Sequence, residues 1–436
     1  MTTGLWHVVF LVTKLGVTRG AALYVGALIG PGVLLVPALA AQAAGAASIV
    51  SWAVLVVLSA PLAITFAALG VRHPVSGGVS AYVREGFGDD AAALTGGWFL
   101  AAVFCGAPAV ALIGGYYVAD LTGSGTGVAA IVGLAMFATV LAANALGLRI
   151  SSGLQLVLAS VLIGVLAVAV AVALPSRGGD NWHPFAPHGW VAVGTAANIL
   201  VWLFVGWEAV AQLAAEFRRP AHDLPRAMAV AFGVVTAVYA GLAVATIGVS
   251  SATGSRVPLA DLIAVGFGQV GRNVTAVLAV ALTMGTMNVY VGGTSKLISS
   301  LAQEGALPAP LARDAHLGIP RRPLLLIGLV GLPMFGVLIA GMVSTEALVR
   351  ATSACFIAVY MLALASAVRI LDGRVRALAL VSLVLTVVVA AFSAWYLLLP
   401  LAAGAAAVGL RRRLASRVCT RPASGLAGTT STRSAT

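Results

Sequence analysis

Long apolar stretches set the strongest limit on what this chain can fold into, because about 20 consecutive apolar residues are enough to cross a lipid bilayer. Of the 436 residues, 61% are hydrophobic and only 9% are charged, whereas about a quarter are charged in soluble domains. Twelve apolar stretches follow one another: residues 20–43, 48–69, 91–118, 127–148, 154–174, 191–217, 227–249, 274–301, 324–342, 347–368, 377–392 and 394–410. The sequence therefore predicts an all-α integral membrane protein with twelve transmembrane helices.

Basic residues outnumber acidic ones and give a formal net charge of +12. They lie mostly in the connections between apolar stretches, where the positive-inside rule explains them better than nucleic-acid binding does. If both termini are cytoplasmic, only Arg177, Arg256, Arg272 and Arg350 face the outer side. We therefore expect a multi-pass protein with both ends in the cytoplasm, a lipid bilayer around it and no nucleic-acid partner.

Two of the apolar stretches, the first and the sixth, contain a helix-weakening tripeptide near the middle. These are Gly30–Gly32, with Pro31 at its centre, and Phe204–Gly206. Interruptions at corresponding places indicate an inverted five-plus-five repeat with discontinuous helices 1 and 6. The predicted organisation is residues 1–15 as a cytoplasmic N-terminus, a membrane domain over 16–410 and a disordered cytoplasmic tail over 411–436. Within the domain, repeat one covers about 16–174, repeat two about 191–368, and two extra helices cover 377–410.

Interrupted backbone cannot face lipid, because each unpaired N–H or C=O group costs several kcal/mol in hydrocarbon. It must therefore line a protected cavity, and a cavity at the membrane midplane suits a solute in transit. A half-helix starting near Gly32 would offer amides and a positive dipole end to a carboxylate. Carbonyls near Phe204 and Val205 would hold an ammonium group, so the pair of breaks fits a zwitterionic amino acid. The alternative is that both breaks are simple kinks.

Glu208 is the one carboxylate well inside an apolar stretch. A charged group at that depth costs on the order of 2.5–3.5 kcal/mol on insertion scales, so it usually faces a cavity or serves ion movement. We interpret Glu208 as a proton-coupling or gating residue, with a protonated, hydrogen-bonded acid as the alternative. No second charge is available at this depth for a substrate side chain, which favours an apolar one. Trp202 beside the break can cap a bound substrate, or it can serve in packing.

Other functions lack the residues that they need. The three cysteines, Cys105, Cys355 and Cys419, have neither a metal-site spacing nor a disulfide pattern. All six histidines lie outside the apolar stretches, so an enzyme, a metal site and a cofactor are not expected. An ion channel would need a filter-like segment, and none is found. For sodium, the hydroxyls of Thr283 and Thr286 together with carbonyls near Gly26 and Ile29 offer a weak set of oxygen ligands.

Five separated segments, in order, resemble the amino acid, polyamine and organocation transporter superfamily. They are VGALIGPGVLLVPA from Val25, HPVSGGVSAYVREGFG from His73, GWFLAAVFCGAPAVALIGGYY from Gly97, FVGWEAVAQLAAEFRRPAHDLPRA from Phe204 and GTSKLISSLAQEGALP from Gly293. Within this superfamily the chain is most similar to bacterial exporters of methionine and branched-chain amino acids. The resemblance implies proton-linked efflux of neutral apolar amino acids across a bacterial plasma membrane, by alternating access. An uptake symporter or an exchanger on the same scaffold is the alternative.

The resemblance also implies roles for individual residues. Trp202 would be the gating aromatic and Glu208 the coupling or gating acid. Where relatives usually have Ser or Thr, this chain has Pro31, and a lysine that some relatives place in span five is absent, so a proton mechanism must rely on Glu208 or on exchange. The complete set of expected substrate contacts is Ile29, Gly30, Pro31, Gly32, Ala101, Ala102, Trp202, Phe204, Val205, Gly206 and Tyr290.

Overall fold

The computed structural model describes residues 15–72, 78–148, 152–176, 178–208, 216–313 and 319–419. Within these ranges every regular element is a helix, and ten helical segments are long and apolar enough to cross a membrane. Two segments are interrupted: residues 191–208, and residues 17–44, whose last part, residues 36–44, is counted in the first of the ten. The regions outside the described residues include residues 1–14 of the predicted N-terminus 1–15, residues 73–77, and residues 420–436 of the predicted tail 411–436.

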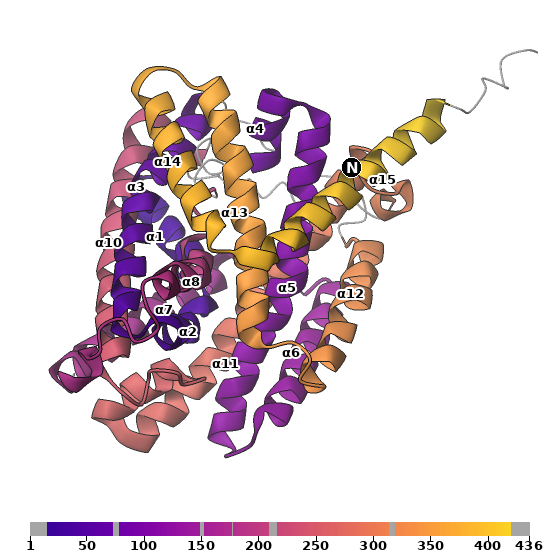
Figure 1. The fold of residues 1–436 in the computed structure, drawn as a ribbon. Coiled ribbons are helices and arrows are strands. Elements are labelled where there is room, and N and C mark those ends of the chain that lie inside the picture. Colours follow the sequence, from indigo (N-terminus) through magenta and orange to yellow (C-terminus); the bar gives the residue numbers. More distant parts are fainter. Residues whose placement is uncertain are drawn as a thin grey trace, which may run out of the picture.

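The helices follow one another in a bundle with few long connections (Figure 1). In chain order they are α1 (Val17–Leu28), η1 (Pro31–Leu34), α2 (Val36–Ala44), α3 (Ser48–Arg72), α4 (Gly78–Phe87), α5 (Asp89–Leu121), α6 (Thr126–Ala145), α7 (Ser152–Ala173), α8 (Val191–Leu200), η5 (Val201–Phe204), α10 (Pro220–Gly248), α11 (Pro258–Gln303), α12 (Arg321–Ile339), α13 (Thr345–Ile370), α14 (Gly373–Ala391), η9 (Ala394–Leu397) and α15 (Leu398–Cys419).

The long helix α5 runs through the bundle and packs against α6, α11, α13 and α15. Small residues allow these close approaches, as is common between helices in membranes. A methyl group built at Gly115 would lie 2.1 Å from the Ala129 carbonyl oxygen, and one at Gly133 would lie 3.1 Å from the Ala111 carbonyl oxygen. The helices α5 and α6 therefore touch backbone to backbone, and the position of α6 depends on these two glycines.

The beginning of α1 is held to the segment that precedes α10. The Leu15 amide donates to the Glu216 carbonyl at 2.8 Å, and the Arg218 amide donates to the Leu15 carbonyl at 3.1 Å. The Phe217 ring stacks on Tyr24 with its centroid 6.1 Å away, and it occupies the space that a side chain at Gly20 would need. These contacts join the starts of two segments that are about 200 residues apart in the sequence.

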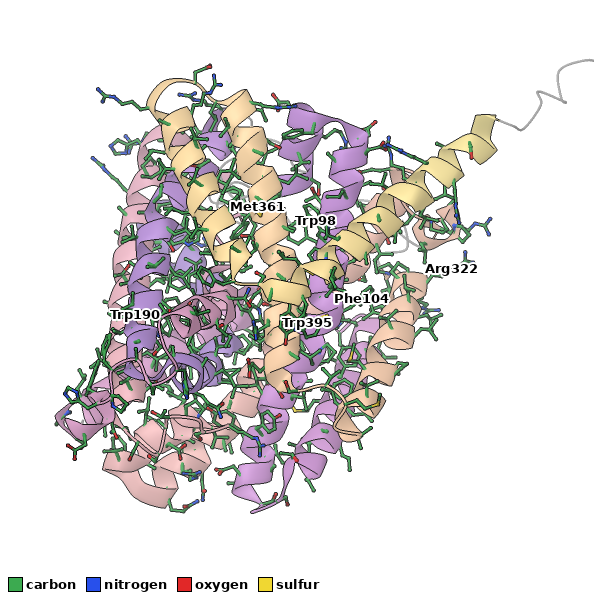
Figure 2. The ribbon with its side chains drawn as sticks, in the orientation of Figure 1. Trp98, Phe104, Trp190, Arg322, Met361 and Trp395 are labelled. Atoms are coloured by element: carbon green, nitrogen blue, oxygen red, sulfur yellow. The ribbon has the colours of Figure 1, made fainter. Side chains whose placement is uncertain are left out.

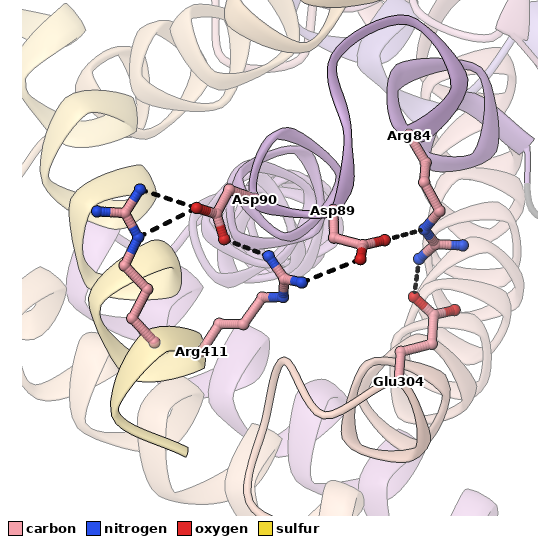
Figure 3. A network of polar contacts seen from close by, with 6 residues as sticks. Arg84, Asp89, Asp90, Glu304 and Arg411 are labelled. Atoms are coloured by element: carbon pink, nitrogen blue, oxygen red, sulfur yellow. Dashed lines mark hydrogen bonds and ion pairs between the residues drawn. The ribbon is translucent and has the colours of Figure 1, made fainter. Parts of the chain in front are cut away.

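One end of the bundle carries an ionic network, which we call the arginine–aspartate network (Figure 3). Asp89, at the first turn of α5, accepts from Arg84 of α4 and from Arg411 of α15, each at 3.1 Å. Arg84 also pairs with Glu304 directly after α11, and Arg411 with Asp90. Exposed ion pairs contribute little one by one. Here, however, they connect four separate elements, α4, α5, α11 and α15.

The ends of some helices differ from the ends that the sequence predicts. Helix α4 lies between two of the predicted apolar stretches, and the stretch predicted to end at residue 301 ends as α11 at Gln303. The last helix continues to Cys419, nine residues beyond the predicted end at Leu410. Its arginines pair with Asp89 and Asp90, which explains why residues 411–419 are helical although they carry no apolar pattern. The all-helical membrane fold is confirmed, while the twelve-helix count and the inverted repeat stay predictions.

The contact between α5 and α6 gives a direct test of helix packing. Gly115→Ala should lower the free energy of unfolding by about 1–3 kcal/mol, as overpacking usually does, because the new methyl group meets backbone that cannot move aside. Gly127→Ala is the matched control, since nothing lies within 4 Å of a methyl group there, and alanine favours the helix by up to about 1 kcal/mol. Thermal unfolding in detergent measures both. Equal melting temperatures for the two variants would contradict the close approach.

Candidate functional site

The first interrupted segment changes backbone conformation three times. Helix α1 ends at Leu28, and Gly30 is extended with φ −101° and ψ −176°. Pro31 then starts the single 3₁₀ turn η1, where its fixed φ and its missing N–H group cost nothing. Leu35, with φ −139° and ψ −43°, separates this turn from α2. The break that the sequence predicts at Gly30–Gly32 is therefore present, and it extends to Leu35.

The predicted half-helix starting near Gly32 is not present in that form. Its first α-helical residue is Val36, four residues later, because a proline at residue 31 begins a 3₁₀ turn and Leu35 interrupts it. The Gly32 amide still has no backbone acceptor among the described residues. A methyl group at Gly30 would meet nothing within 4 Å, so there is open space beside this residue. The Gly32 N–H group remains a candidate donor for a carboxylate, but without a full helix dipole behind it.

The second interrupted segment breaks at Val205 and Gly206, directly after η5. Val205 is extended, with φ −76° and ψ 135°, and Gly206 has φ +132°, a conformation that side chains disfavour. A methyl group at Gly206 would lie 2.9 Å from the Ala27 carbonyl oxygen. The two breaks therefore lie side by side, and residue 206 must be glycine both for its own conformation and for the approach of α1.

Two buried tyrosines from two different helices supply donors to the backbone at the first break and just before the second. The Tyr239 hydroxyl of α10 lies 3.0 Å from the Leu28 carbonyl oxygen and 2.7 Å from the Leu203 carbonyl oxygen. The Tyr117 hydroxyl of α5 donates to the Leu34 carbonyl at 2.9 Å. A hydroxyl carries one proton, so Tyr239 serves one of its two carbonyls at a time. The Tyr239 side chain therefore lies beside one backbone carbonyl of each interrupted segment.

Glu208 is bound to the second break and does not stand alone. Its Oε2 atom accepts from the Gly206 amide at 3.0 Å and from the Tyr360 hydroxyl of α13 at 2.5 Å. The Gly206 amide also lies 3.1 Å from the Tyr360 hydroxyl oxygen. The carboxyl group, the hydroxyl and the freed amide therefore form a closed triangle. A change at Glu208 would therefore directly alter the hydrogen bonds of the backbone at the break and of α13.

The aromatic residues near the second break point in different directions. Trp202 lies 3.9 Å from the position of a methyl group on Gly106 of α5, so its ring spans the distance from η5 to α5. Phe204 packs edge to face on Trp52 and Tyr239, with ring centroids 6.2 and 5.2 Å away. Trp207 packs on Phe232 of α10. All three rings therefore contact other helices, and Trp202 is the one of the three that lies beside α5.

The other expected site residues lie on α5 and α11. Ala102 is fully buried and its carbonyl lies 3.5 Å from the Thr352 hydroxyl of α13, whereas Ala101 and Tyr290 are partly exposed. Among the possible sodium ligands, the Thr283 hydroxyl already donates to the Ala279 carbonyl at 2.8 Å. The lone pairs of this oxygen are still available to a cation, but the hydroxyl group points along its own helix. The substrate-contact roles of these residues stay predictions.

A cavity of about 870 Å³ opens at the end of the bundle opposite to the arginine–aspartate network. Its apolar inner part includes Leu35, directly after η1, and Leu112 of α5. Its rim carries Arg272, which binds both oxygens of Asp120 at 2.8 and 2.7 Å, and Arg256, which lies 5.7 Å from the centre of the Tyr116 ring. The cavity therefore leads from a charged surface to the edge of the first break.

The described part of the chain contains no group of three His, Cys, Asp or Glu side chains that could hold a metal ion. Cys105 and Cys355 are buried and free. Sequence reasoning missed Tyr117, Tyr239 and Tyr360. A signal was present, because a tyrosine within an apolar stretch needs a partner for its hydroxyl group. Which carbonyl or carboxylate it reaches depends on the packing of distant helices.

Comparison with known proteins identifies the family of this chain. The amino acid permease family profile matches residues 15–409. The chain is 32% identical to the uncharacterized amino acid permease YecA of Bacillus subtilis over 89% of this chain and 93% of that protein. It is 31% identical to the L-methionine/branched-chain amino acid exporter YjeH of Escherichia coli, over 88% and 92% of the two chains. The branched-chain amino acid permease BcaP of Bacillus subtilis is 25% identical over 69% of each chain.

Glycine at the second break is open to a direct stability test. Gly206→Ala should destabilise the protein by about 1–3 kcal/mol or more, since alanine is strained at this φ and its methyl group meets the Ala27 carbonyl. Gly30→Ala is the control at the other break, because its φ of −101° suits alanine and no atom lies nearby. Thermal unfolding of both purified variants provides the measurement. If Gly206→Ala and the wild type had the same melting temperature, the described break would be wrong.

Proposed function

This chain belongs to the amino acid permease family, and from that premise we propose that it is a secondary active transporter of neutral apolar amino acids. In this proposal it works by alternating access and exports its substrate in exchange for protons. It lies in a bacterial plasma membrane. Family membership excludes an enzyme, because the relatives are permeases and transporters.

The observation that carries the proposal is the meeting of two broken segments in the interior of the bundle. The Leu28 and Leu203 carbonyls converge on the Tyr239 hydroxyl, and carbonyls at a helix end carry a partial negative charge. The Gly32 amide on the other side of the first break lacks a backbone acceptor within the described residues. A zwitterion fits such a place, with its ammonium group toward the carbonyls and its carboxylate toward the amide.

An apolar substrate side chain follows from what surrounds the breaks. The one carboxylate there, Glu208, is bound by Tyr360 and by the Gly206 amide, so it is not free to pair with a cationic side chain. Ala101, Ala102 and Tyr290 would form the wall, and Trp202 would cover the substrate. The remaining proposed contacts are the backbone of Ile29, Gly30, Pro31, Phe204, Val205 and Gly206.

Proton linkage is assigned to Glu208 because its carboxyl group touches the break itself. Protonation would convert an acceptor for the Gly206 amide into a group that can also donate. The hydrogen bonds at the break would then rearrange. The protonated and deprotonated states of Glu208 would then differ in the contact between the second broken segment and α13. Such a difference can link proton binding to the opening of the transporter on one side of the membrane.

The proposed topology counts the two interrupted segments with the ten long helices, giving twelve membrane segments. The first and sixth would then be discontinuous, which supports an inverted five-plus-five repeat with two additional helices, α14 and α15. Both termini would be cytoplasmic. The arginine–aspartate network would then mark the cytoplasmic end, and the 870 Å³ cavity would open outward.

Uptake on the same scaffold is the second candidate, because one relative is named a branched-chain amino acid permease and another an exporter. Vesicles of opposite orientation distinguish the two directions. Export predicts accumulation of leucine or methionine in inside-out vesicles with an acidic interior, and little in right-side-out ones. Counterflow, in which unlabelled substrate inside speeds the entry of labelled substrate, would support a carrier. Its absence would favour a channel.

The coupling role of Glu208 is tested by Glu208→Gln. This variant keeps the size and one acceptor but cannot exchange a proton, so it should bind substrate while losing accumulation driven by a pH gradient. Proteoliposomes with an imposed pH difference provide the measurement, and Glu216→Gln is the control at an exposed carboxylate. Unchanged pH dependence in Glu208→Gln would remove this residue from the coupling mechanism.

The cap role of Trp202 predicts a loss of affinity that grows with substrate size. Trp202→Ala should raise the dissociation constant for leucine by about two- to tenfold, equivalent to the roughly 0.5–1.5 kcal/mol that an aromatic contact contributes. The effect on alanine should be smaller. Trp190→Ala serves as the control, since this residue is 66% exposed on the surface. Equal leucine affinity in Trp202→Ala and wild type would assign Trp202 to packing alone.

A further inference from the structure

An apolar groove of about 720 Å³ lies between α6 and α12, apart from the site described above. Its lining includes three small residues, Ala142 and Ala145 of α6 and Gly328 of α12. They leave room between the two helices. Leu325 and Leu329 line it as well and are 73% and 75% exposed. In a membrane span, such exposure means that the groove is open to lipid.

Among the residues that the structure describes, Arg321 is the single charged residue that lines this groove, and no described carboxylate lines it. Arg321 is exposed and has no ion pair within the described residues. The neighbouring Arg322 donates instead to the Pro310 carbonyl at 3.0 Å. Figure 2 shows Arg322 at the first turn of α12, on the outer edge of the bundle. Within the part of the chain that the structure describes, the groove therefore combines an apolar wall with one positive charge that no carboxylate balances.

We propose that this groove binds an anionic phospholipid, with an acyl chain along the apolar wall and the phosphate at Arg321. Arg321 begins a segment that is apolar enough to cross the membrane, so it lies where chain and headgroup regions of the bilayer meet. Basic residues at that depth attract anionic headgroups. The lipid would belong to the leaflet on the side of the arginine–aspartate network, the cytoplasmic one in the proposed topology.

Two other charged cavities of the described residues do not offer the same chemistry. In the cavity of about 320 Å³ beside the arginine–aspartate network, Arg84 and Arg411 are balanced by Asp89 and Glu304. In the 870 Å³ cavity, Asp120 and Glu346 accompany the arginines. Charge complementarity toward a phosphodiester together with an apolar wall therefore favours the groove of Arg321.

Native mass spectrometry of the full-length protein, taken from nanodiscs of equal parts phosphatidylglycerol and phosphatidylcholine, tests the proposal by counting retained lipids. Wild type should retain phosphatidylglycerol in preference to phosphatidylcholine. Arg321→Gln should lower bound phosphatidylglycerol about fivefold, the factor equivalent to the roughly 1 kcal/mol that one basic residue contributes near anionic lipid. Arg374→Gln, an exposed arginine at the first turn of α14, should leave retention unchanged.

A second variant tests the apolar part of the site. Gly328→Leu fills the groove, where a methyl group meets side chains only at 3.5 Å or more, and should lower retention of both lipids while the protein still melts normally. Glycerol phosphate without acyl chains should not displace the lipid. Retention of phosphatidylglycerol at the wild-type level in both Arg321→Gln and Gly328→Leu would overturn the proposal. Equal retention of the two lipids by wild type, displacement by glycerol phosphate, or a second protein copy seated on α6 and α12 would overturn it too.

Discussion

Backbone groups that no helix satisfies are the constraint on which the centre of this protein depends. In an apolar interior each such group costs several kcal/mol, and breaking two segments at the same place frees several of them. Tyr239 meets the carbonyls of Leu28 and Leu203, Tyr117 meets that of Leu34, and Glu208 with Tyr360 meets the amide of Gly206. Because the partners come from α5, α10 and α13 and from the broken segment itself, the breaks can exist only inside the assembled bundle.

The same arrangement explains how a rigid bundle can contain a site that changes. The long helix α5 is fixed by backbone contact with α6 at Gly115 and Gly133 and, at one end, by the arginine–aspartate network (Figure 3). The broken segments instead depend on a few hydrogen bonds to side chains. Exchanging the partner of such a hydrogen bond costs less free energy than separating two packed helices. In the proposed function, movement would therefore concentrate where Glu208 and Tyr239 hold the backbone.

The proposed lipid site lies on the outer surface of the bundle. The α6–α12 groove belongs to helices next to α5 and α11 and lies away from the two breaks. A bound phospholipid there would support the fixed part of the bundle, since α6 contacts α5 at Gly115 and Gly133 and α12 contacts α6. This role does not require the groove to take part in the transport cycle.

The sequence by itself determined the membrane class, the long helices and the places where two of them break, because apolar length, glycine and proline act locally. It also identified Glu208 and Trp202 as unusual residues in their segments. Only the tertiary structure decided that α2 begins at Val36, that α15 continues to Cys419 and that Tyr117, Tyr239 and Tyr360 hold the breaks. These facts depend on which distant helix supplies a hydroxyl or a carboxylate, and a hydrogen bond between residues 36 to 211 positions apart leaves no periodic pattern in the chain.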